Sequence, residues 1–309
     1  MTTLRLGSRA SALARAQAQL VADRLAGALG AEVRIVDIRT RGDRDRSPLA
    51  DIGGQGVFVG AVRGSLAAGQ VDIAVHSLKD LPTEGDDRVV LAAVPERADP
   101  RDALVAARGR TLATLDPGAR VGTGSARRAA QLLAARPDLS VVPVRGNVDT
   151  RLALVERGEV GAVVLAMAGL LRLGREDAVT DLLDPSTMLP APGQGALAVE
   201  VAAANVELAG EVAAVLDEPA TRLAVTAERE LLAALGVGCS APVGALGTLH
   251  GPLERRRLRL EALRAEPDGT LVVRKSAEGW PGEGVALAHR LADLLCADAA
   301  VGVRGESLR

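Results

Sequence analysis

Apolar and polar positions alternate along the chain with two different periodicities, which predict short strands and longer helices. β-branched runs such as 71–75 and 162–165 indicate strands that are buried in a sheet. Segments rich in Ala and Leu, such as the one that ends near Leu29, indicate helices between these strands. Strands that alternate with helices are typical of an α/β fold.

The predicted elements follow one another over the whole chain. Strands are expected at 4–7, 33–38, 71–75, 89–94, 120–122, 140–144, 162–165, 196–201, 258–264 and 271–274. Helices are expected up to about residue 29, at 59–68, from 123 to about 136, from about 148, and at 206–216, 221–235 and 285–300. Loops are expected at 40–51 and at the glycine-rich 52–58, and crossings between lobes at 95–102 and 189–195.

Polar and ionisable residues follow the strand predicted at 71–75. They are His76, Ser77, Lys79 and Asp80. In open α/β sheets, ligands bind beyond the carboxyl ends of strands, so these side chains are candidates for a binding site. Lys79 is one of only two lysines among 37 Lys and Arg residues, which favours a specific use of its compact ammonium group. A solvated ion pair between Lys79 and Asp80 is the alternative, and the local sequence leaves both open.

Arginines stand at several predicted strand ends and helix starts. They are Arg9, Arg127, Arg128, Arg145 and Arg151. Two of them, Arg127 and Arg128, lie in the first turn of a helix, where cations are unfavourable unless an anion lies among them. Together with Lys79, the arginines predict a cationic cleft between two lobes. Such a cleft suits a ligand with several carboxylate or phosphate groups.

Composition restricts the classes of function. The 309 residues are 48% hydrophobic and suggest two or three domains. With one Phe, one Trp, no Tyr and a net charge of −2, the chain is expected to bind neither nucleic acid nor a membrane. The three histidines are scattered, which predicts no metal site. The N-terminus lacks an apolar signal segment, so we expect a cytoplasmic protein.

Several candidate residues also have a plain structural explanation. Cys239 lies among glycines and a proline and is expected to be accessible as a nucleophile or attachment point, although an inert loop cysteine is equally compatible with the sequence. Cys296 lies in an Ala- and Leu-rich helix, where we expect a buried structural thiol. Phe58 either packs in the core or contacts a ligand. Arg9 either binds an anion or is an exposed arginine beside a helix capped by a nearby serine.

Five motifs give the chain a resemblance to a known family. They are His76-Ser77-Leu78-Lys79-Asp80-Leu81-Pro82, Gly122-Thr123-Gly124-Ser125-Ala126-Arg127-Arg128, Arg145-Gly146-Asn147-Val148-Asp149-Thr150-Arg151, Pro192-Gly193-Gln194-Gly195-Ala196 and Gly238-Cys239-Ser240-Ala241-Pro242. In this order they resemble the motifs of the porphobilinogen deaminases, also called hydroxymethylbilane synthases. The resemblance runs from Arg5 to the final helix and is weakest after about Leu249. The motifs are specific together, although none would be alone.

The resemblance implies a fold and a division into domains. It implies an α/β protein with two lobes like those of type II periplasmic binding proteins, and a small C-terminal α+β domain. The first lobe would comprise residues 1–96 and 194–217, and the second 97–193. The C-terminal domain, to which the cofactor is attached, would comprise 218–309. The resemblance also implies a monomer.

The resemblance implies a reaction as well. A transferase of this family joins four molecules of porphobilinogen head to tail onto a dipyrromethane cofactor and releases ammonia at each step. It then releases hydroxymethylbilane by hydrolysis, as part of tetrapyrrole and haem biosynthesis. The cofactor would be attached through a thioether to Cys239. Each pyrrole carries an acetate and a propionate, which agrees with the multiply acidic ligand inferred from the arginines.

The family's site residues can be placed on this sequence position by position. The resemblance implies Asp80 and Lys79 as catalytic residues, with Asp80 stabilising positive charge that develops on the pyrrole nitrogen and assisting proton transfers. Contacts to the cofactor are implied for Ser77, Lys79, Thr123, Ser125, Arg127, Arg128, Arg145 and Gly146, besides the bond to Cys239. Contacts to the substrate are implied for Arg9, Ser11, Gln17, Phe58, Arg145, Arg151, Ala168 and Gln194.

The chain departs from the family's pattern at three positions. Many members have lysines where Asp51 and Gln55 stand here, and a serine is often found at the position of Gly124. These changes remove positive charge and a hydrogen-bond donor from the expected cleft, and they bear on loop closure and affinity. A two-lobed anion-binding or sensor protein without catalytic activity is the alternative function. The presence of a covalent cofactor would separate the two.

Overall fold

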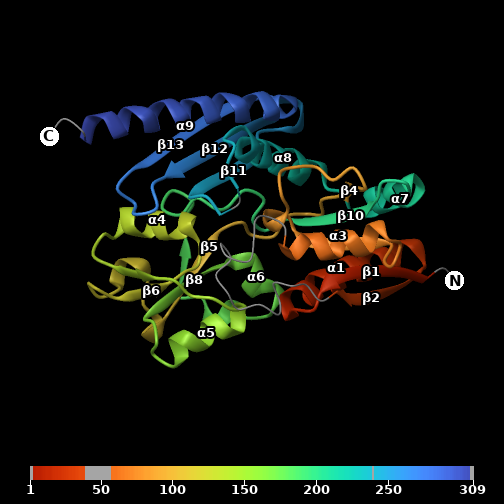
Figure 1. Cartoon of the computed structure of the whole chain (residues 1–309), viewed down its shortest axis with the longest axis horizontal. Coiled ribbons are helices and arrows are strands. Elements are labelled where there is room, and N and C mark those ends of the chain that lie inside the picture. The colour runs from red at the N-terminus through yellow and green to blue at the C-terminus, as the bar shows by residue number, and fades with distance from the viewer. Residues whose placement is uncertain (1–2, 39–56, 239, 307–309) are drawn as a thin grey trace. The chain divides into compact units, whose positions relative to one another are not determined.

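Figure 1 shows the computed structural model, which describes residues 3–38, 57–238 and 240–306. The chain divides into two compact units. The first comprises Met1–Ala98 and Gly195–Arg222, and the second comprises Asp99–Gln194 and Leu223–Arg309. The chain therefore passes from one unit to the other three times, and two of these passages fall within the segments 95–102 and 189–195.

The first unit is built on a five-stranded sheet. Its strands are β1 (Thr3–Arg9), β2 (Glu32–Ile38), β3 (Ile73–Ser77), β4 (Val89–Ala93) and β10 (Leu197–Ala202), in the spatial order β2-β1-β3-β10-β4. β1 pairs in parallel with β2 and β3, whereas β10 runs antiparallel between β3 and β4. The first sheet is thus completed by a strand from much later in the chain.

Helices cover both faces of this sheet. They are α1 (Ala12–Leu29), α3 (Val57–Ala67) and α7 (Val206–Leu216), with the short 3-10 helix η1 (Leu78–Asp80) directly after β3. On one face, Ile73 and Val75 of β3 pack against apolar side chains of α1 and α7. On the other face, Ala74 packs with side chains of α3. Successive strand residues point to opposite faces, so His76 lies on the face that α3 covers.

The second unit contains a sheet with the same arrangement. Its strands are β5 (Asp102–Ala106), β6 (Arg120–Gly122), β7 (Ser140–Val142), β8 (Ala162–Ala166) and β9 (Asp181–Leu183), in the order β7-β6-β8-β5-β9. Here β5 is the antiparallel strand between β8 and β9, as β10 is in the first sheet. The helices are α4 (Ala126–Ala135), α5 (Val148–Glu156) and α6 (Met167–Arg172), with the 3-10 helices η2 (Ala107–Gly109), η3 (Leu112–Thr114) and η4 (Glu176–Ala178).

The last part of the chain forms an antiparallel three-stranded sheet. Its strands are β11 (Val243–His250), β12 (Arg257–Ala265) and β13 (Val272–Gly279), in sequence order. Helices α8 (Pro219–Ala234) and α9 (Gly284–Glu306) pack on it, and the connections contain η5 (Leu253–Arg255) and η6 (Pro281–Glu283). Leu263 of β12 packs against Ala130 of α4, which joins this sheet to the rest of the second unit. Among the described residues, no helix is both long and apolar enough to cross a bilayer.

The predicted α/β fold is confirmed, and most predicted elements are present with shifted ends. The strand predicted at 71–75 spans Ile73–Ser77, so His76 and Ser77 belong to the sheet. Their backbones pair with β10, a partner strand that the local sequence does not reveal. The loops predicted at 40–51 and 52–58 lie outside the described residues, except that Val57 and Phe58 begin α3.

Some elements have no predicted counterpart. Strands β5, β9 and β11 and helix α6 were not predicted. The charge of Asp102 suggested a loop, but Asp102 begins β5 and is fully buried. The expectation of a buried thiol at Cys296 is wrong, because the side chain is exposed. Its neighbour Leu295 takes the core-facing position on α9 instead, and Arg264 donates to the Cys296 sulfur at 3.4 Å.

Candidate active site

A pocket in the first unit is lined by polar side chains from β1, α1, β3 and η1. The residues come from the end of β1, the start of α1, and the end of β3 with η1. The polar side chains are Arg9, Ser11, Gln17, His76, Ser77 and Asp80. Five of these six were predicted as site residues, and His76 was noted only as part of the polar run after the strand. The sheet thus brings together residues that lie far apart in the sequence.

The start of α1 forms one wall of this pocket. Ser11 is the N-cap, and its hydroxyl accepts a hydrogen bond from the backbone N–H of Ala14 at 3.3 Å. Ser8 is buried instead and donates its hydroxyl hydrogen to the carbonyl of Ala14 at 3.0 Å. One turn further along, the amide of Gln17 donates to the hydroxyl of Ser77 at 2.9 Å. This bond ties the helix to the end of β3 and fixes the position of Ser77.

Lys79 and Asp80 lie in the single turn of η1 that follows β3. Asp80 is exposed and lines the pocket, whereas Lys79 is half-buried. A short 3-10 turn directly after a strand holds the two side chains near the carboxyl end of β3, as the sequence predicted. Among the described residues, no group of His, Cys, Asp and Glu side chains could hold a metal ion. The polar groups that line this pocket are a carboxylate, an imidazole, hydroxyls, an amide and a guanidinium.

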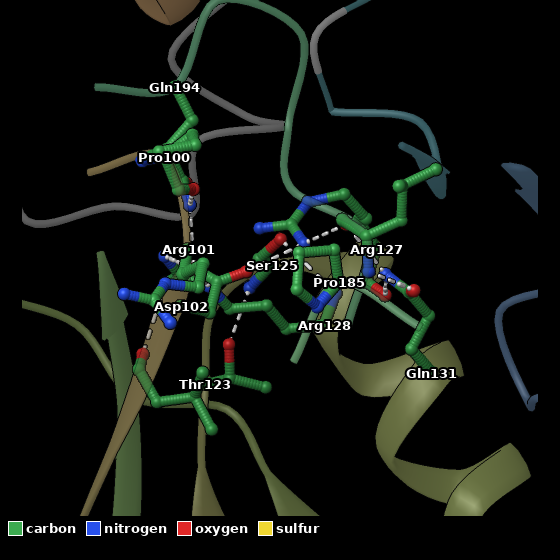
Figure 2. A network of polar contacts seen from close by, with 12 residues as sticks. Pro100, Arg101, Asp102, Thr123, Ser125, Arg127, Arg128, Gln131, Pro185 and Gln194 are labelled. Carbon is green, nitrogen blue, oxygen red and sulfur yellow. Dashed lines mark hydrogen bonds and ion pairs between the residues drawn. The ribbon is translucent and has the colours of Figure 1, made fainter. Parts of the chain in front are cut away.

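The second unit holds the two arginines at the start of α4. Ser125 caps this helix, and Thr123 accepts a hydrogen bond from the backbone N–H of Ser125 at 3.2 Å. Arg127 and Arg128 are almost fully buried and both contact Asp102 of β5 (Figure 2). Sequence reasoning expected an anion among these cations. The structure provides one from within the chain.

Asp102 balances only part of this charge. Burial alone would raise the pKa of Asp102, but attraction to Arg127 and Arg128 outweighs burial and lowers it. Nη1 of Arg127 lies 2.8 Å from Oδ2 of Asp102 without the alignment of a hydrogen bond, and Nε of Arg127 has no hydrogen-bond partner. Gln194 donates to Oδ1 of Asp102 at 2.9 Å. Two cations thus share one carboxylate, and the group keeps a net positive charge.

The guanidinium of Arg127 has a second contact, to the backbone. This second contact uses the same nitrogen as the contact with Asp102: Nη1 donates to the backbone carbonyl of Leu189 at 2.6 Å. The side chain of Gln131 donates to the same carbonyl at 3.0 Å and accepts from the N–H of Leu189 at 2.7 Å (Figure 2). This buried network fixes the guanidinium against the segment before Gln194. Neither Asp102 nor Gln131 was predicted as part of a site.

The next strand-to-helix turn carries Arg145, Gly146 and Arg151. Asn147 caps α5 by accepting from the N–H of Thr150 at 2.9 Å. Gly146 has φ = +103°, and a Cβ atom there would lie 2.7 Å from Cβ of Thr150, so only glycine fits. Arg145 is exposed at this turn.

Arg151 differs from the other arginines of the second unit. Its side chain makes no hydrogen bond or ion pair with the described residues, and its Nε is enclosed. Burial, and to a lesser degree the like charge of Arg128, lowers the pKa of Arg151. A half-buried cation that faces a second cation is unfavourable unless an anion joins them. Arg151 is therefore the strongest structural sign of an anion site in this unit.

Helix α6 and the turn at Gly124 hold further residues that bear on the site. Ala168 is buried in α6. Arg172, at the end of the same helix, was not predicted, and burial lowers its pKa to about 10. A Cβ atom at Gly124 would lie 2.8 Å from the carbonyl oxygen of Val144, so this backbone leaves no room for a serine. Cys239, Asp51, Gln55 and the side chain of Phe58 lie outside the described residues.

Two family models, one for each of two domains, together match the chain almost from end to end. Residues 4–210 match "Porphobilinogen deaminase, dipyromethane cofactor binding domain", and residues 222–297 match "Porphobilinogen deaminase, C-terminal domain". The chain is 53% identical over 312 residues to "Porphobilinogen deaminase 1" of Streptomyces coelicolor, with 98% of each chain covered. It is 51% identical over 304 residues to "Porphobilinogen deaminase" of Acidothermus cellulolyticus, with 97% of this chain and 90% of that protein covered.

Solved structures of substrate-binding proteins are similar at a greater distance. A periplasmic substrate-binding protein of an ABC transporter from Coxiella burnetii is 13% identical, with a TM-score of 0.44, and the match covers 71% of this chain and 94% of that chain. A periplasmic binding protein with arginine specificity from Salmonella typhimurium is 14% identical, with a TM-score of 0.39, and the match covers 70% of this chain and 92% of that chain.

Proposed function

The chain belongs to the porphobilinogen deaminase family, and from this premise we propose which of its residues carry out the family's reaction. The enzyme is a transferase of tetrapyrrole biosynthesis. It condenses four porphobilinogens head to tail onto a dipyrromethane cofactor, with loss of ammonia at each step, and releases hydroxymethylbilane by hydrolysis. The dipyrromethane supplies the pyrrole to which the first substrate is joined.

The proposal rests on the excess positive charge of the arginines near Asp102 in the second unit. Asp102 offers one negative charge to Arg127 and Arg128, and Arg151 has no ionic partner among the described residues. These residues fit a group with several carboxylates, such as a dipyrromethane with its acetates and propionates. We assign to Arg151 and the exposed Arg145 the binding of ligand carboxylates. Arg128 already uses Nε and Nη2 to bind Asp102, and Nη1 of Arg127 lies between Asp102 and the carbonyl of Leu189, so these two arginines contribute mainly their charge.

The turn before α4 supplies neutral hydrogen-bonding groups to the same ligand. Ser125 is the N-cap and Thr123 lies next to it, so hydroxyls and backbone N–H groups stand beside the arginines. Helix starts favour bound anions because their first N–H groups lack partners within the helix. Gly146, which allows the next turn to form, and Gln194, which donates to Asp102, support the arrangement.

In the first unit, Asp80 is the proposed catalytic residue. Loss of ammonia leaves positive charge on a pyrrole ring, and a carboxylate that accepts a hydrogen bond from the ring N–H stabilises this charge. Asp80 is exposed at the pocket and can approach a bound ring. Lys79 beside it is proposed to keep Asp80 ionised or to contact a carboxylate of the cofactor. Arg9, with Ser11 and Gln17 nearby, is proposed to bind the carboxylates of the incoming substrate, and Phe58 and Ala168 to contact it.

Covalent attachment of the cofactor is assigned to Cys239. The assignment follows from the motif Gly238-Cys239-Ser240-Ala241-Pro242, and the residue lies outside the described part of the chain. This thiol would hold the dipyrromethane through a thioether. The second cysteine, Cys296, is exposed on α9, so variants of both cysteines are needed to test the assignment.

The domain limits, the oligomeric state and the cellular location remain our proposals. We propose lobes at 1–96 with 194–217 and at 97–193, a C-terminal domain at 218–309, and a monomer that works in the cytoplasm. A catalytically silent anion-binding protein is the competing function. Incubation of the purified protein with porphobilinogen separates the two: the enzyme releases four molecules of ammonia for each tetrapyrrole, whereas a binding protein releases none.

A further inference from the structure

Three charged or titratable side chains of the first unit form a buried group beside the pocket. Arg63 of α3 donates to both carboxylate oxygens of Glu200 in β10, at 2.6–3.2 Å. Nε2 of His76 in β3 lies 3.3 Å from Oε2 of the same carboxylate. The exposed fractions of these side chains are 11% for Arg63, 2% for Glu200 and 4% for His76. The reaction as assigned above uses none of them.

Strand pairing brings His76 and Glu200 together. In the antiparallel pairing of β3 with β10, His76 lies opposite Ala198, and Ala74 lies opposite Glu200. The four residues therefore share one face of the sheet, the face that α3 covers. Burial alone would raise the pKa of Glu200, but its contacts with His76 and Arg63 outweigh burial and lower it. Glu200 is thus a buried carboxylate whose charge Arg63 balances.

The two ring nitrogens of His76 have different surroundings. Nε2 faces Glu200 and is sealed from solvent, although the contact lacks the alignment of a hydrogen bond. Nδ1 makes no hydrogen bond to the described residues and is not among the enclosed polar atoms, while His76 lines the pocket with Asp80. A carboxylate beside Nε2 keeps the proton of the neutral ring on that nitrogen. The lone pair is then on Nδ1, the nitrogen that is not sealed from solvent.

Each condensation must remove a proton from carbon. The free α-carbon of the last pyrrole forms a bond to the aminomethyl carbon of an incoming porphobilinogen, whose carbon–nitrogen bond breaks, and ammonia leaves with that electron pair. The attacking carbon then loses its hydrogen as a proton, and the electron pair of the carbon–hydrogen bond restores the aromatic ring. In the proposed function the carboxylate of Asp80 already accepts a hydrogen bond from the ring N–H. A second basic group would accept the carbon-bound proton without the loss of this hydrogen bond.

We propose that His76 is this acceptor, through Nδ1; the proposal rests on the function assigned above. The proton moves from carbon to Nδ1, and the imidazolium then passes it to the departing ammonia or to water. Glu200 stabilises the imidazolium, and Arg63 holds Glu200 ionised and in place. The charged groups that face the imidazole are Glu200 and Arg63 on the buried side, and Arg9 and Asp80 around the pocket. His76 is therefore a catalytic residue and not only a packed histidine.

The variant His76→Gln separates proton acceptance from packing. A glutamine amide keeps an N–H near the place of Nε2, toward Glu200, but has no basic nitrogen at the place of Nδ1. We expect this variant to carry the cofactor and to lose about 100-fold in kcat. With α-deuterated porphobilinogen its kinetic isotope effect should exceed that of the wild type, because proton removal becomes the slow step. The control His289→Gln, which removes an exposed histidine 3.0 Å from Glu230, should keep the wild-type kcat.

Two further measurements keep the proposal falsifiable if His76→Gln does not fold. The chain has only three histidines, so NMR of 15N-histidine-labelled wild-type protein can assign the tautomer of each. His76 should carry its proton on Nε2 at neutral pH. The double variant Arg63→Gln/Glu200→Gln removes the buried pair together, and its kcat should fall because the imidazolium loses the carboxylate that stabilises it.

The outcomes distinguish this inference from the proposed function. A proton on Nδ1 of His76, a double variant with wild-type kcat, or a His76→Gln variant with wild-type kcat and isotope effect would each overturn the role of His76 while leaving the enzyme assignment intact. A wild-type protein that releases no ammonia from porphobilinogen would overturn the proposed function, and the role of His76 with it.

Discussion

The guanidinium of Arg128 donates two hydrogen bonds to one oxygen of Asp102, from Nε at 3.0 Å and from Nη2 at 2.7 Å. Asp102 has no exposed surface and begins β5, whereas Arg128 stands in the first turn of α4. The pair thus joins β5 to the start of α4 and holds this helix against the sheet of the second unit. It also leaves the charge of Arg127 only partly balanced, which gives this part of the unit its affinity for anions.

Replacement of Asp102 tests the structural side of this pair. In Asp102→Asn the shape is kept, but two buried guanidinium groups lose their counter-ion. Because breaking a buried ion pair leaves an uncompensated charge, we expect the free energy of unfolding to fall by about 3–5 kcal/mol. The control Asp99→Asn affects a pair with Arg101 whose side chains are 22% and 40% exposed, and should cost less than about 1 kcal/mol. Urea denaturation of both variants measures the difference; equal losses would contradict the account.

The same pair predicts a dependence of stability on pH. The pKa of Asp102 is lowered in the folded state, so the unfolded chain takes up the proton more readily. The stabilisation is therefore fully present above the unfolded pKa of about 3.9 and is lost as the pH falls below it toward the folded pKa. The difference in unfolding free energy between wild type and Asp102→Asn should be constant from pH 5 to 7 and should shrink below pH 4. A difference that grows on acidification would reverse the sign of this argument.

Arg151 should be needed for function and not for stability. It is half-buried, lacks a partner among the described residues and faces the like charge of Arg128, so Arg151→Leu should leave the free energy of unfolding unchanged or raise it. Loss of a charged hydrogen bond to a ligand carboxylate should raise KM for porphobilinogen about 10- to 100-fold, or lower cofactor content. Arg157→Leu, which removes an exposed arginine paired with Glu159, is the matched control. Unchanged kinetics and cofactor content in Arg151→Leu would remove this residue from the site.

The turn at Gly146 should tolerate no side chain. Gly146 combines φ = +103° with contact to Thr150, whereas Gly158 has φ = +68° and open space around it. Gly158→Ala should cost about 1 kcal/mol of stability and leave kcat/KM unchanged. Gly146→Ala should also lower kcat/KM, because the turn that places Arg145 must shift. Steady-state kinetics beside thermal melting would show this, and equal kcat/KM in the two variants would refute it.

Asp80 should be required for turnover but not for folding. Asp80→Asn keeps the size of the side chain and removes its negative charge, so we expect an unchanged melting temperature, retained cofactor and a kcat lower by at least about 100-fold. The control Asp87→Ala removes an exposed carboxylate of the same unit outside the pocket and should be fully active. Release of ammonia from porphobilinogen measures both, and a near-wild-type rate in Asp80→Asn would exclude the proposed role.

The sequence predicts the local features of this protein well. The periods of the strands and helices set the α/β fold, and the serine cap expected for the first long helix is present at Ser11. Each of these features depends on residues a few positions apart.

Features that depend on distant residues were not predicted. Asp102 looked like part of a charged loop, because the two arginines that neutralise it lie in a different element. His76 looked like a loop residue, because its strand partner β10 comes much later in the chain. The positive φ of Gly146 could be suspected from its residue type, but its contact with Thr150 could not. The sequence therefore gave the residues of the candidate site without the contacts that balance their charges.

The central claim is that the chain builds a tetrapyrrole on a cofactor bound to Cys239, and intact mass measures this directly. Freshly purified wild-type protein should exceed its polypeptide mass by two pyrrole units and give colour with Ehrlich's reagent. Cys239→Ser should show the bare polypeptide mass and no colour, whereas Cys296→Ser should keep the cofactor. A bare mass for the wild type that does not change after addition of porphobilinogen would contradict the enzyme assignment, and a cofactor that disappears only with Cys296 would contradict the attachment site.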